Sequence, residues 1–149
     1  MRAVVQRVRS ASVDVEGERV AEMADGLLVL VGVGLGDDTG AARELAHKLV
    51  HLRVFEDEDG RMNRSLLEAG GTLGLVSQFT LLGDVRKGRR PSFGQSAPSD
   101  QAEPLVRAVA DAARSAGVVV VEGRFGAEMD VSLVNRGPVT LLIDTERLF

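Results

Sequence analysis

Leu27-Leu28-Val29-Leu30-Val31-Gly32-Val33 presents apolar side chains at successive positions, without the polar alternation of a half-exposed strand. Such a run predicts a strand that is buried on both faces. Before it, residues 4–15 alternate apolar and polar side chains, with a break around Arg9–Ala11. This pattern predicts two short strands at the start of the chain.

A helix is predicted after the buried strand, at residues 39–51. Its apolar stripe consists of Leu45, Leu49 and Leu52, which recur at helical spacing. Asp38 or Thr39 is expected to be the N-cap, because a short polar side chain can accept a hydrogen bond from a free N–H group there.

A second helix is predicted at residues 100–116. Asp100 and Glu103 have the spacing of a capping box, and Gly117 stands where the helix is expected to stop. Pro104 is expected within the first turn, where the missing N–H group is tolerated.

Further short strands are predicted at residues 54–55, 72–79 and 118–121. Two final strands, at 129–133 and 139–143, are expected to be joined by a turn at Asn135-Arg136-Gly137. Strands outnumber helices, and several are joined by short turns. The chain is therefore predicted to form one mixed α/β domain over residues 1–149, with a mainly antiparallel, barrel-like sheet and two main helices.

Composition excludes several kinds of chemistry. The 149 residues include no cysteine, so disulfides, thiolate catalysis and cysteine-ligated zinc are ruled out. The formal net charge of −4 argues against nucleic-acid binding by the molecule as a whole. Residues 1–7 carry charges too early for a secretory signal, and no apolar run is long enough to cross a membrane. We expect a cytoplasmic protein that binds neither a membrane nor DNA.

Two patterns that suggest ligand sites have simpler interpretations. His47 and His51 are four residues apart on the first predicted helix, opposite its leucine stripe, so we expect surface residues and no metal site. Gly32, Gly34 and Gly36 lack the further glycine of a dinucleotide-binding loop and are expected to end a strand. No histidine faces the predicted core, so a serine–histidine–aspartate triad is not expected, nor is a cofactor.

The run Arg86-Lys87-Gly88-Arg89-Arg90 places four cations within five residues. Alone, such a run is typical of a solvated surface loop. Here it follows the stretch Ser77-Gln78-Phe79-Thr80 at the end of an apolar strand, so a phosphate-binding patch beside a site is the alternative interpretation. Aromatic residues make up only 3% of the chain, which argues against RNA binding by base stacking.

Several ordered motifs together resemble the D-aminoacyl-tRNA deacylase family, also called D-tyrosyl-tRNA deacylases, over essentially the full chain. These motifs are Ala3 to Val8, Leu52 to Asp57, Met62-Asn63, Val76 to Leu81, Lys87 to Phe93, Gly123 to Met129, and Asn135 to Thr140. Arg136 departs from the family pattern, in which Asp is expected before the Gly-Pro pair. This departure concerns the local turn geometry.

The resemblance implies an enzyme that hydrolyses the ester at the acceptor end of D-aminoacyl-tRNA, as a homodimer with both active sites at the interface. Ser77, Gln78, Phe79 and Thr80 would line the pocket for the terminal adenosine and the ester. Backbone groups of Phe79 and Thr80 would lie near the scissile bond, and Met129 would form part of the pocket wall.

The family resemblance also implies how D and L substrates are distinguished. Gly137-Pro138, expected to be joined by a cis peptide bond, would enter the partner's pocket, where its carbonyls hold the amino group and exclude an L side chain. Arg7 would orient this motif. A filter of this kind also admits glycine, so glycyl-tRNA is an expected substrate. Arg86, Lys87, Arg89 and Arg90 are the expected tRNA contacts.

No general base is evident in the sequence, so we expect hydrolysis assisted by the 2′-OH of the terminal ribose, with Thr80 as a positioning residue. Thr80 as a nucleophile is the alternative mechanism. Two other functions stay open at this point. One is a hydrolase of small D-amino-acid esters, which would not need the basic loop. The other is a non-catalytic RNA- or replication-associated binding protein, which would not need Gly137-Pro138.

Overall fold

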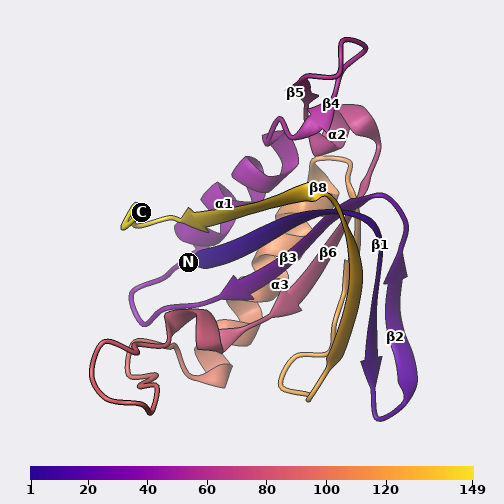
Figure 1. The fold of residues 1–149 in the computed structure, drawn as a ribbon. Helices are drawn as coiled ribbons and strands as arrows, with labels where there is room; N and C mark the ends of the chain where they lie inside the picture. The colour runs from indigo at the N-terminus through magenta and orange to yellow at the C-terminus, as the bar shows by residue number, and fades with distance from the viewer.

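Strands dominate both ends of the chain, and helices lie between them, in the computed structural model of residues 1–149 (Figure 1). The first part consists of β1 (Arg2–Val15), β2 (Glu18–Met23), β3 (Gly26–Gly32) and helix α1 (Thr39–His51). The middle consists of the small hairpin β4 (Phe55–Glu56) and β5 (Met62–Arg64), then helix α2 (Leu66–Ala69). The last part consists of β6 (Thr72–Ser77), the 3₁₀ helix η1 (Phe79–Leu82), helix α3 (Ser99–Ser115), β7 (Val119–Glu122) and β8 (Asp130–Asp144).

β1 is the strand that organises the sheet. Its residues 2–8 pair with β3 and its residues 11–15 pair with β2, while β8 pairs with it along both halves. The prediction of two short opening strands is therefore wrong. The break at Arg9–Ala11 marks the point where β1 exchanges one antiparallel partner for another. The exchange bends β1 and β8 together, and the sheet curls into a nearly closed, barrel-like shape (Figure 1).

The other half of the sheet is parallel. β3 pairs with β6, and β6 pairs with β7, both in parallel, so the chain must cross over between them. The segment with α1 and α2 makes the first crossover, and α3 makes the second. The main sheet thus combines three antiparallel and two parallel pairings, and its mainly antiparallel character is confirmed only in part.

Two hydrophobic clusters hold these layers together. The larger one has 25 buried residues and joins the sheet to α1 and α3. It includes Leu45 and Leu49 of the predicted stripe and most of the predicted buried strand, whose Leu27 and Val29 are fully buried. The smaller cluster has 7 buried residues from β1, β2, β3 and β6 and lies inside the curl of the sheet. None of the helices is long and apolar enough to cross a membrane.

The helix ends agree only partly with the sequence signals. Asp38 is the N-cap of α1 and accepts a hydrogen bond from the backbone N–H of Ala41, as predicted. The capping box predicted for α3 is wrong, because its N-cap is Pro98 and no side chain caps it. The helix begins at Ser99, so Pro104 lies in its second turn, beyond the first turn predicted for it.

β8 is continuous where the sequence predicts two strands and a turn. Its register with β1 shifts on either side of Val8, so Arg136, Gly137 and Pro138 leave the ladder and the strand then resumes. The side chain of Asn135 closes this bulge, since it accepts from the Val139 N–H at 2.7 Å and donates to the Val139 carbonyl at 3.1 Å. A turn and a bulge share the same local residue types, and only the partner strand distinguishes them.

Candidate active site

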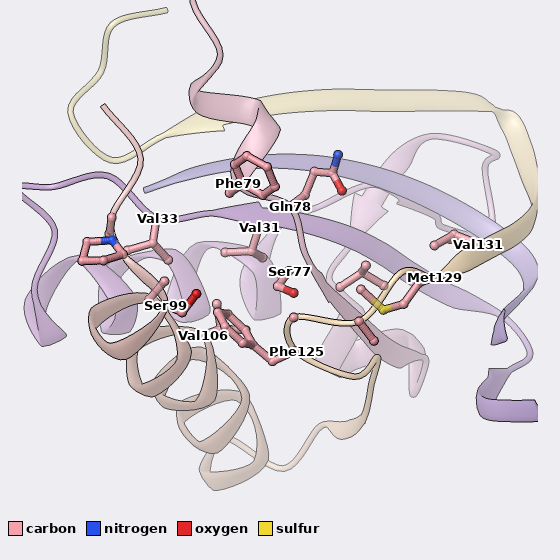
Figure 2. A pocket seen from close by; sticks show the side chains of 16 residues that line it. Val31, Val33, Ser77, Gln78, Phe79, Ser99, Val106, Phe125, Met129 and Val131 are labelled. Atoms are coloured by element: carbon pink, nitrogen blue, oxygen red, sulfur yellow. The ribbon is translucent and has the colours of Figure 1, made fainter. Parts of the chain in front are cut away.

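A cavity of about 490 Å³ opens beside the ends of β3 and β6 (Figure 2). Its walls come from β3, β6, the start of η1, the N-terminus of α3 and the segment that leads into β8. The lining residues are Val31, Val33, Val76, Ser77, Gln78, Phe79, Ala97, Pro98, Ser99, Ala102, Val106, Phe125, Gly126, Ala127, Met129 and Val131. Four of the predicted site residues, Ser77, Gln78, Phe79 and Met129, are among them.

The location of the cavity follows from the parallel pairing of β3 with β6. Val31 is in register with Ser77, so both strands end at the same edge of the sheet. In α/β sheets, ligands bind outside the carboxyl ends of parallel strands, where the connecting segments diverge. The Gln78 N–H donates to the Val31 carbonyl at 2.7 Å, which fixes the chain as it turns from β6 into η1.

The lining contains no aspartate, glutamate, histidine, lysine or arginine. Its polar side chains are Ser77, Gln78 and Ser99, and eleven of its sixteen residues are hydrophobic. An apolar site with a few polar groups excludes bulk water and strengthens the electrostatic effect of the dipoles that remain. Chemistry in this cavity must therefore rely on amide and hydroxyl groups of the protein or on groups of the ligand.

The N-terminus of α3 supplies one such dipole. Pro98, Ser99 and Ala102 lie in the cavity wall, and no side chain caps the helix at this end. The first N–H groups of a helix lack partners within it and carry a partial positive charge. This end of the cavity therefore favours a ligand group that is, or becomes, negatively charged.

Thr80 lies at the rim and is not one of the lining residues. It is exposed on η1, and its hydroxyl accepts a hydrogen bond from the Gln78 side-chain amide. No titratable side chain is hydrogen-bonded to it, so no protein group stands ready to take its proton.

Gly137 and Pro138 are exposed on the bulge of β8 and do not line the cavity of their own chain. The peptide bond between them is cis. Arg7 is buried behind the bulge and donates to the carbonyls of Arg136, at 2.9 Å, and of Val54, at 2.6 Å. The residue that the sequence analysis expects to orient the motif thus contacts the peptide group next to Gly137.

The basic run forms the tip of an exposed loop between η1 and α3. Asp84 and Ser92 close this loop through two mutual backbone hydrogen bonds of 2.8 and 2.9 Å. Arg86 is bound to Asp84 in the loop, and its hydrogen bonds hold the pKa of that carboxyl well below the ordinary value. Three of the four predicted cations, Lys87, Arg89 and Arg90, make no ion pair within the chain.

The placement predicted for the histidine pair and for the glycine run is confirmed: the histidines are surface residues, and the glycines lie at the end of a strand. His47 and His51 are exposed on α1 with ring centroids 4.3 Å apart. The chain has no group of three or more histidine, aspartate or glutamate side chains placed to share a metal ion. β3 ends at Gly32, and Gly34 forms only an isolated bridge with Ser96.

Several residues of the cavity were not singled out in the sequence. Phe125 and Val106 face the cavity from two different segments, and Ser99 stands at the N-terminus of α3 (Figure 2). Phe125 lies in the motif from Gly123 to Met129, and this part of the family resemblance is the only feature of the sequence that points to it. The positions of Val106 and Ser99 depend on how α3 packs on the sheet, which no local pattern specifies.

Comparison with known proteins gives a consistent result. A family model described as D-Tyr-tRNA(Tyr) deacylase matches residues 4–144. A D-aminoacyl-tRNA deacylase of Thermomicrobium roseum is 57% identical over 148 residues, which cover 99% of this chain and 96% of that protein. A protein of the same name from Thermosipho africanus is 53% identical over 149 residues and all of both chains.

Two solved structures are similar in fold. The structure of the c-Myc DNA Unwinding Element Binding Protein has a TM-score of 0.91 and 38% sequence identity, and the match covers 97% of this chain and 98% of that one. The structure of a probable eukaryotic D-amino acid tRNA deacylase has a TM-score of 0.82 and covers 95% of this chain and 97% of that one. Its sequence identity is 21%, so this likeness concerns the fold alone.

Arg7→Lys is expected to lower the free energy of unfolding by about 1–3 kcal/mol, because a lysine cannot donate to both buried carbonyls in the fork geometry of arginine. Urea denaturation followed by circular dichroism measures this change. Arg9→Lys, at an exposed position of the same strand, is the matched control. Equal stability of the two variants would show that the Arg7 hydrogen bonds do not hold the bulge.

Proposed function

Because this chain belongs to the D-Tyr-tRNA(Tyr) deacylase family, we propose that it hydrolyses the ester between a D-amino acid and the terminal ribose of tRNA. The match over nearly the full length to relatives named D-aminoacyl-tRNA deacylase carries this proposal. Water adds to the ester carbonyl, and the bond to the ribose oxygen breaks. The free D-amino acid and a tRNA with a free terminal hydroxyl leave. The activity removes D-amino acids from translation, and we place it in the cytoplasm.

The cavity beside β3 and β6 is the proposed site for the terminal adenosine and the ester. Ser77 and Gln78 provide polar side chains at its edge, and Phe79 and Met129 form part of its wall. The backbone N–H groups of Phe79 and Thr80 would stabilise the oxyanion that develops on the ester carbonyl. Oriented backbone donors are effective in an apolar site, because they need no reorganisation during the reaction.

The proposed active unit is a homodimer in which the bulge of each chain enters the partner's cavity. Gly137 and Pro138 are exposed and lie outside their own cavity, so they are free to serve a second one. β8 pairs only with β1 and leaves its other edge open, while Val134 and Leu142 on it are 52% and 62% exposed. An edge strand with exposed apolar side chains is a surface that a partner usually covers.

Rejection of L substrates is assigned to the backbone of this bulge. D- and L-aminoacyl esters carry the same atoms and differ only in the direction of the side chain, so attractive contacts alone cannot separate them. A wall of backbone is rigid, whereas a side chain can change its rotamer. Glycyl-tRNA, which has no side chain to exclude, would pass the same filter and be hydrolysed.

Gly137→Ala tests this assignment. An added methyl group would crowd the substrate's amino group, and it would also lie 2.8 Å from Val139 Cγ2 in a backbone with φ of +142°. Turnover of D-aminoacyl-tRNA is expected to fall by on the order of a hundredfold, as a small misplacement at a reacting centre can do.

The assay times ester loss from matched D- and L-aminoacyl-tRNAs with the native chain, Gly137→Ala and the control Gly36→Ala. An alanine side chain at position 36 would contact only Glu146 Oε1, at 3.9 Å. Native protein that leaves both esters intact refutes the deacylase function. A Gly137→Ala variant that folds, dimerises and hydrolyses the D ester normally reduces the motif to a structural bulge.

Three cations of the loop at residues 84–92 are proposed to bind tRNA phosphates. Lys87, Arg89 and Arg90 are exposed and unpaired, whereas Arg86 is bound to Asp84 and contributes less positive potential. Changing Arg89 and Arg90 to alanine is expected to weaken binding about equally for different tRNA bodies and to reduce the dependence of the binding constant on salt concentration. Filter binding over a salt series measures both. An unchanged salt slope would assign the loop to solubility alone.

The name of the structure at 38% identity attributes the binding of a DNA element to that protein. In this chain the densest run of unpaired cations lies on one loop, the other unpaired cations are spread along the sequence, and the net charge is −4, which disfavours an extended contact with duplex DNA. Duplex DNA belongs in the same binding series. Binding of duplex DNA as tight as that of aminoacyl-tRNA would favour a nucleic-acid-binding protein over a deacylase.

The proposed mechanism uses the substrate in place of a protein base. No titratable side chain lines the cavity, so the 2′-OH of the terminal ribose is assigned to position and activate the attacking water. Thr80, at the rim and hydrogen-bonded to Gln78, is assigned to positioning. A threonine nucleophile would need a base to take its proton, and no titratable side chain is hydrogen-bonded to Thr80.

A D-aminoacyl-tRNA whose terminal ribose lacks the 2′-OH decides between these mechanisms. It is expected to bind nearly normally and to react about 10²–10⁴-fold more slowly, the usual contribution of general acid–base catalysis. Thr80→Ala is expected to have a smaller effect on the native substrate. Single-turnover assays of both substrates with both proteins show whether loss of the 2′-OH or Thr80→Ala slows hydrolysis more. An inactive Thr80→Ala together with normal turnover of the 2′-deoxy ester would establish Thr80 as the nucleophile.

A further inference from the structure

The basic loop at residues 84–92 follows directly after η1, the turn that carries the proposed oxyanion donors. The chain leaves η1 at Gly83, and the hydrogen bonds between Asp84 and Ser92 close the loop. Phe93 is the first residue after this closure and lies back against η1. The turn and the end of the loop are therefore joined through side chains as well as through the backbone.

Phe93 fills the space against both ends of η1. Its ring meets the ring of Phe79 edge to face, with centroids 5.0 Å apart and an angle of 68° between the planes. The same ring lies beside Gly83, where an added Cβ would be 3.0 Å from its Cε1 atom. One aromatic side chain thus contacts the first residue of the turn and the residue that ends it.

The segment after Phe93 contributes a second contact. The Ser96 hydroxyl donates to the Phe79 carbonyl at 3.1 Å, and the Ser96 N–H donates to the Phe93 carbonyl at 3.0 Å. Ser96 is itself anchored by its bridge to Gly34. The Phe79 peptide unit is thereby held from outside the cavity by a segment fixed to the end of β3.

η1 cannot hold this geometry alone. It is a four-residue 3₁₀ helix whose backbone hydrogen bonds include Leu81 to Gln78, at 3.3 Å, and Gly83 to Thr80, at 2.9 Å. Phe79 is 57% exposed, so the hydrophobic core does not fix it either. Donors that stabilise an oxyanion must stay aligned, because a small misplacement removes much of their effect.

We propose that Phe93 is a positioning residue for ester hydrolysis, which acts through the ring of Phe79 to hold the backbone N–H groups of residues 79 and 80 in place. The proposal rests on the deacylase function given above and assigns Phe93 no contact with the reacting atoms. Its loss should slow the hydrolytic step and leave the affinity for tRNA unchanged.

Phe93→Leu, which keeps an apolar side chain but removes the aromatic edge, tests this proposal in single-turnover assays. Two substrates are compared, a D-aminoacyl-tRNA and the corresponding D-aminoacyl-adenosine, which has no further nucleotides. The hydrolysis rate constant at saturation should fall about three- to tenfold on both, as expected for loss of an aromatic pair. Phe93→Tyr, which keeps the aromatic ring, should have the native rate constant. The control Phe149→Leu, at an exposed aromatic residue near the chain end, should also leave the rate constant unchanged.

The outcomes separate this proposal from the deacylase function. Native protein without deacylase activity removes the function and the proposal with it. An active native protein whose Phe93→Leu variant hydrolyses both esters at the native rate overturns the proposal alone. A weaker affinity for the tRNA substrate, with normal rates on the adenosine ester, also overturns it, because Phe93 would then be a nucleotide contact.

Ser96→Ala keeps the proposal testable if Phe93→Leu does not fold. It removes only the hydroxyl that holds the Phe79 carbonyl, and it is expected to reduce the rate constant about threefold on both substrates. Thermal unfolding checks that the variant is folded at the assay temperature. A folded Ser96→Ala variant with native rates would show that the turn does not depend on this segment.

Discussion

The backbone ladder between β1 and β8 is the interaction on which the rest of the structure depends. It runs from the pair Arg2 and Asp144 to the pair Asp14 and Asp130, and it is interrupted only opposite residues 6–10. Because the strand is held on both sides of this interruption, Arg136, Gly137 and Pro138 have no position in the ladder and must project from it. The exposed motif is therefore a product of long-range pairing, stabilised from behind by Arg7 and from within by the Asn135 side chain.

In the same sheet, the motif does not line the cavity of its own chain. β1 pairs with β3 in antiparallel orientation, and β3 pairs with β6 in parallel. The ends of β3 and β6 open onto the cavity. On the proposed function, the exposed backbone motif of one chain would act on the apolar cavity of a second copy. This arrangement has a chemical advantage, because the rigid wall formed by Gly137-Pro138 and the oxyanion donors on η1 come from different chains. Each is then held in place by contacts within its own chain.

Local patterns were sufficient for the parts of the fold that short segments decide. Asp38 and the leucine stripe predicted α1, and the apolar run at 27–33 predicted a buried strand. β1 was predicted as two strands because the exchange of its partners from β3 to β2 leaves only a polar break in the sequence. In the candidate site, residues 77–79 were found through the family resemblance. Ser99 and Val106 were not, because they reach the cavity only through the packing of α3.

The basic loop and the uncharged cavity proposed for the reaction lie in different parts of this molecule. The cavity has no ionisable lining, whereas the unpaired cations Lys87, Arg89 and Arg90 lie outside it, on the loop that follows η1 and is closed by Asp84 and Ser92. The net charge is −4, so on the proposed function a phosphate would be attracted by a local run of cations such as this loop and not by the molecule as a whole. At physiological salt this attraction reaches only about 8 Å, so it acts on phosphates close to the loop. We therefore propose separate roles for the two regions. The charges of the loop bring the acceptor end of the tRNA to the rim of the cavity, and the uncharged dipoles inside the cavity stabilise the reacting ester.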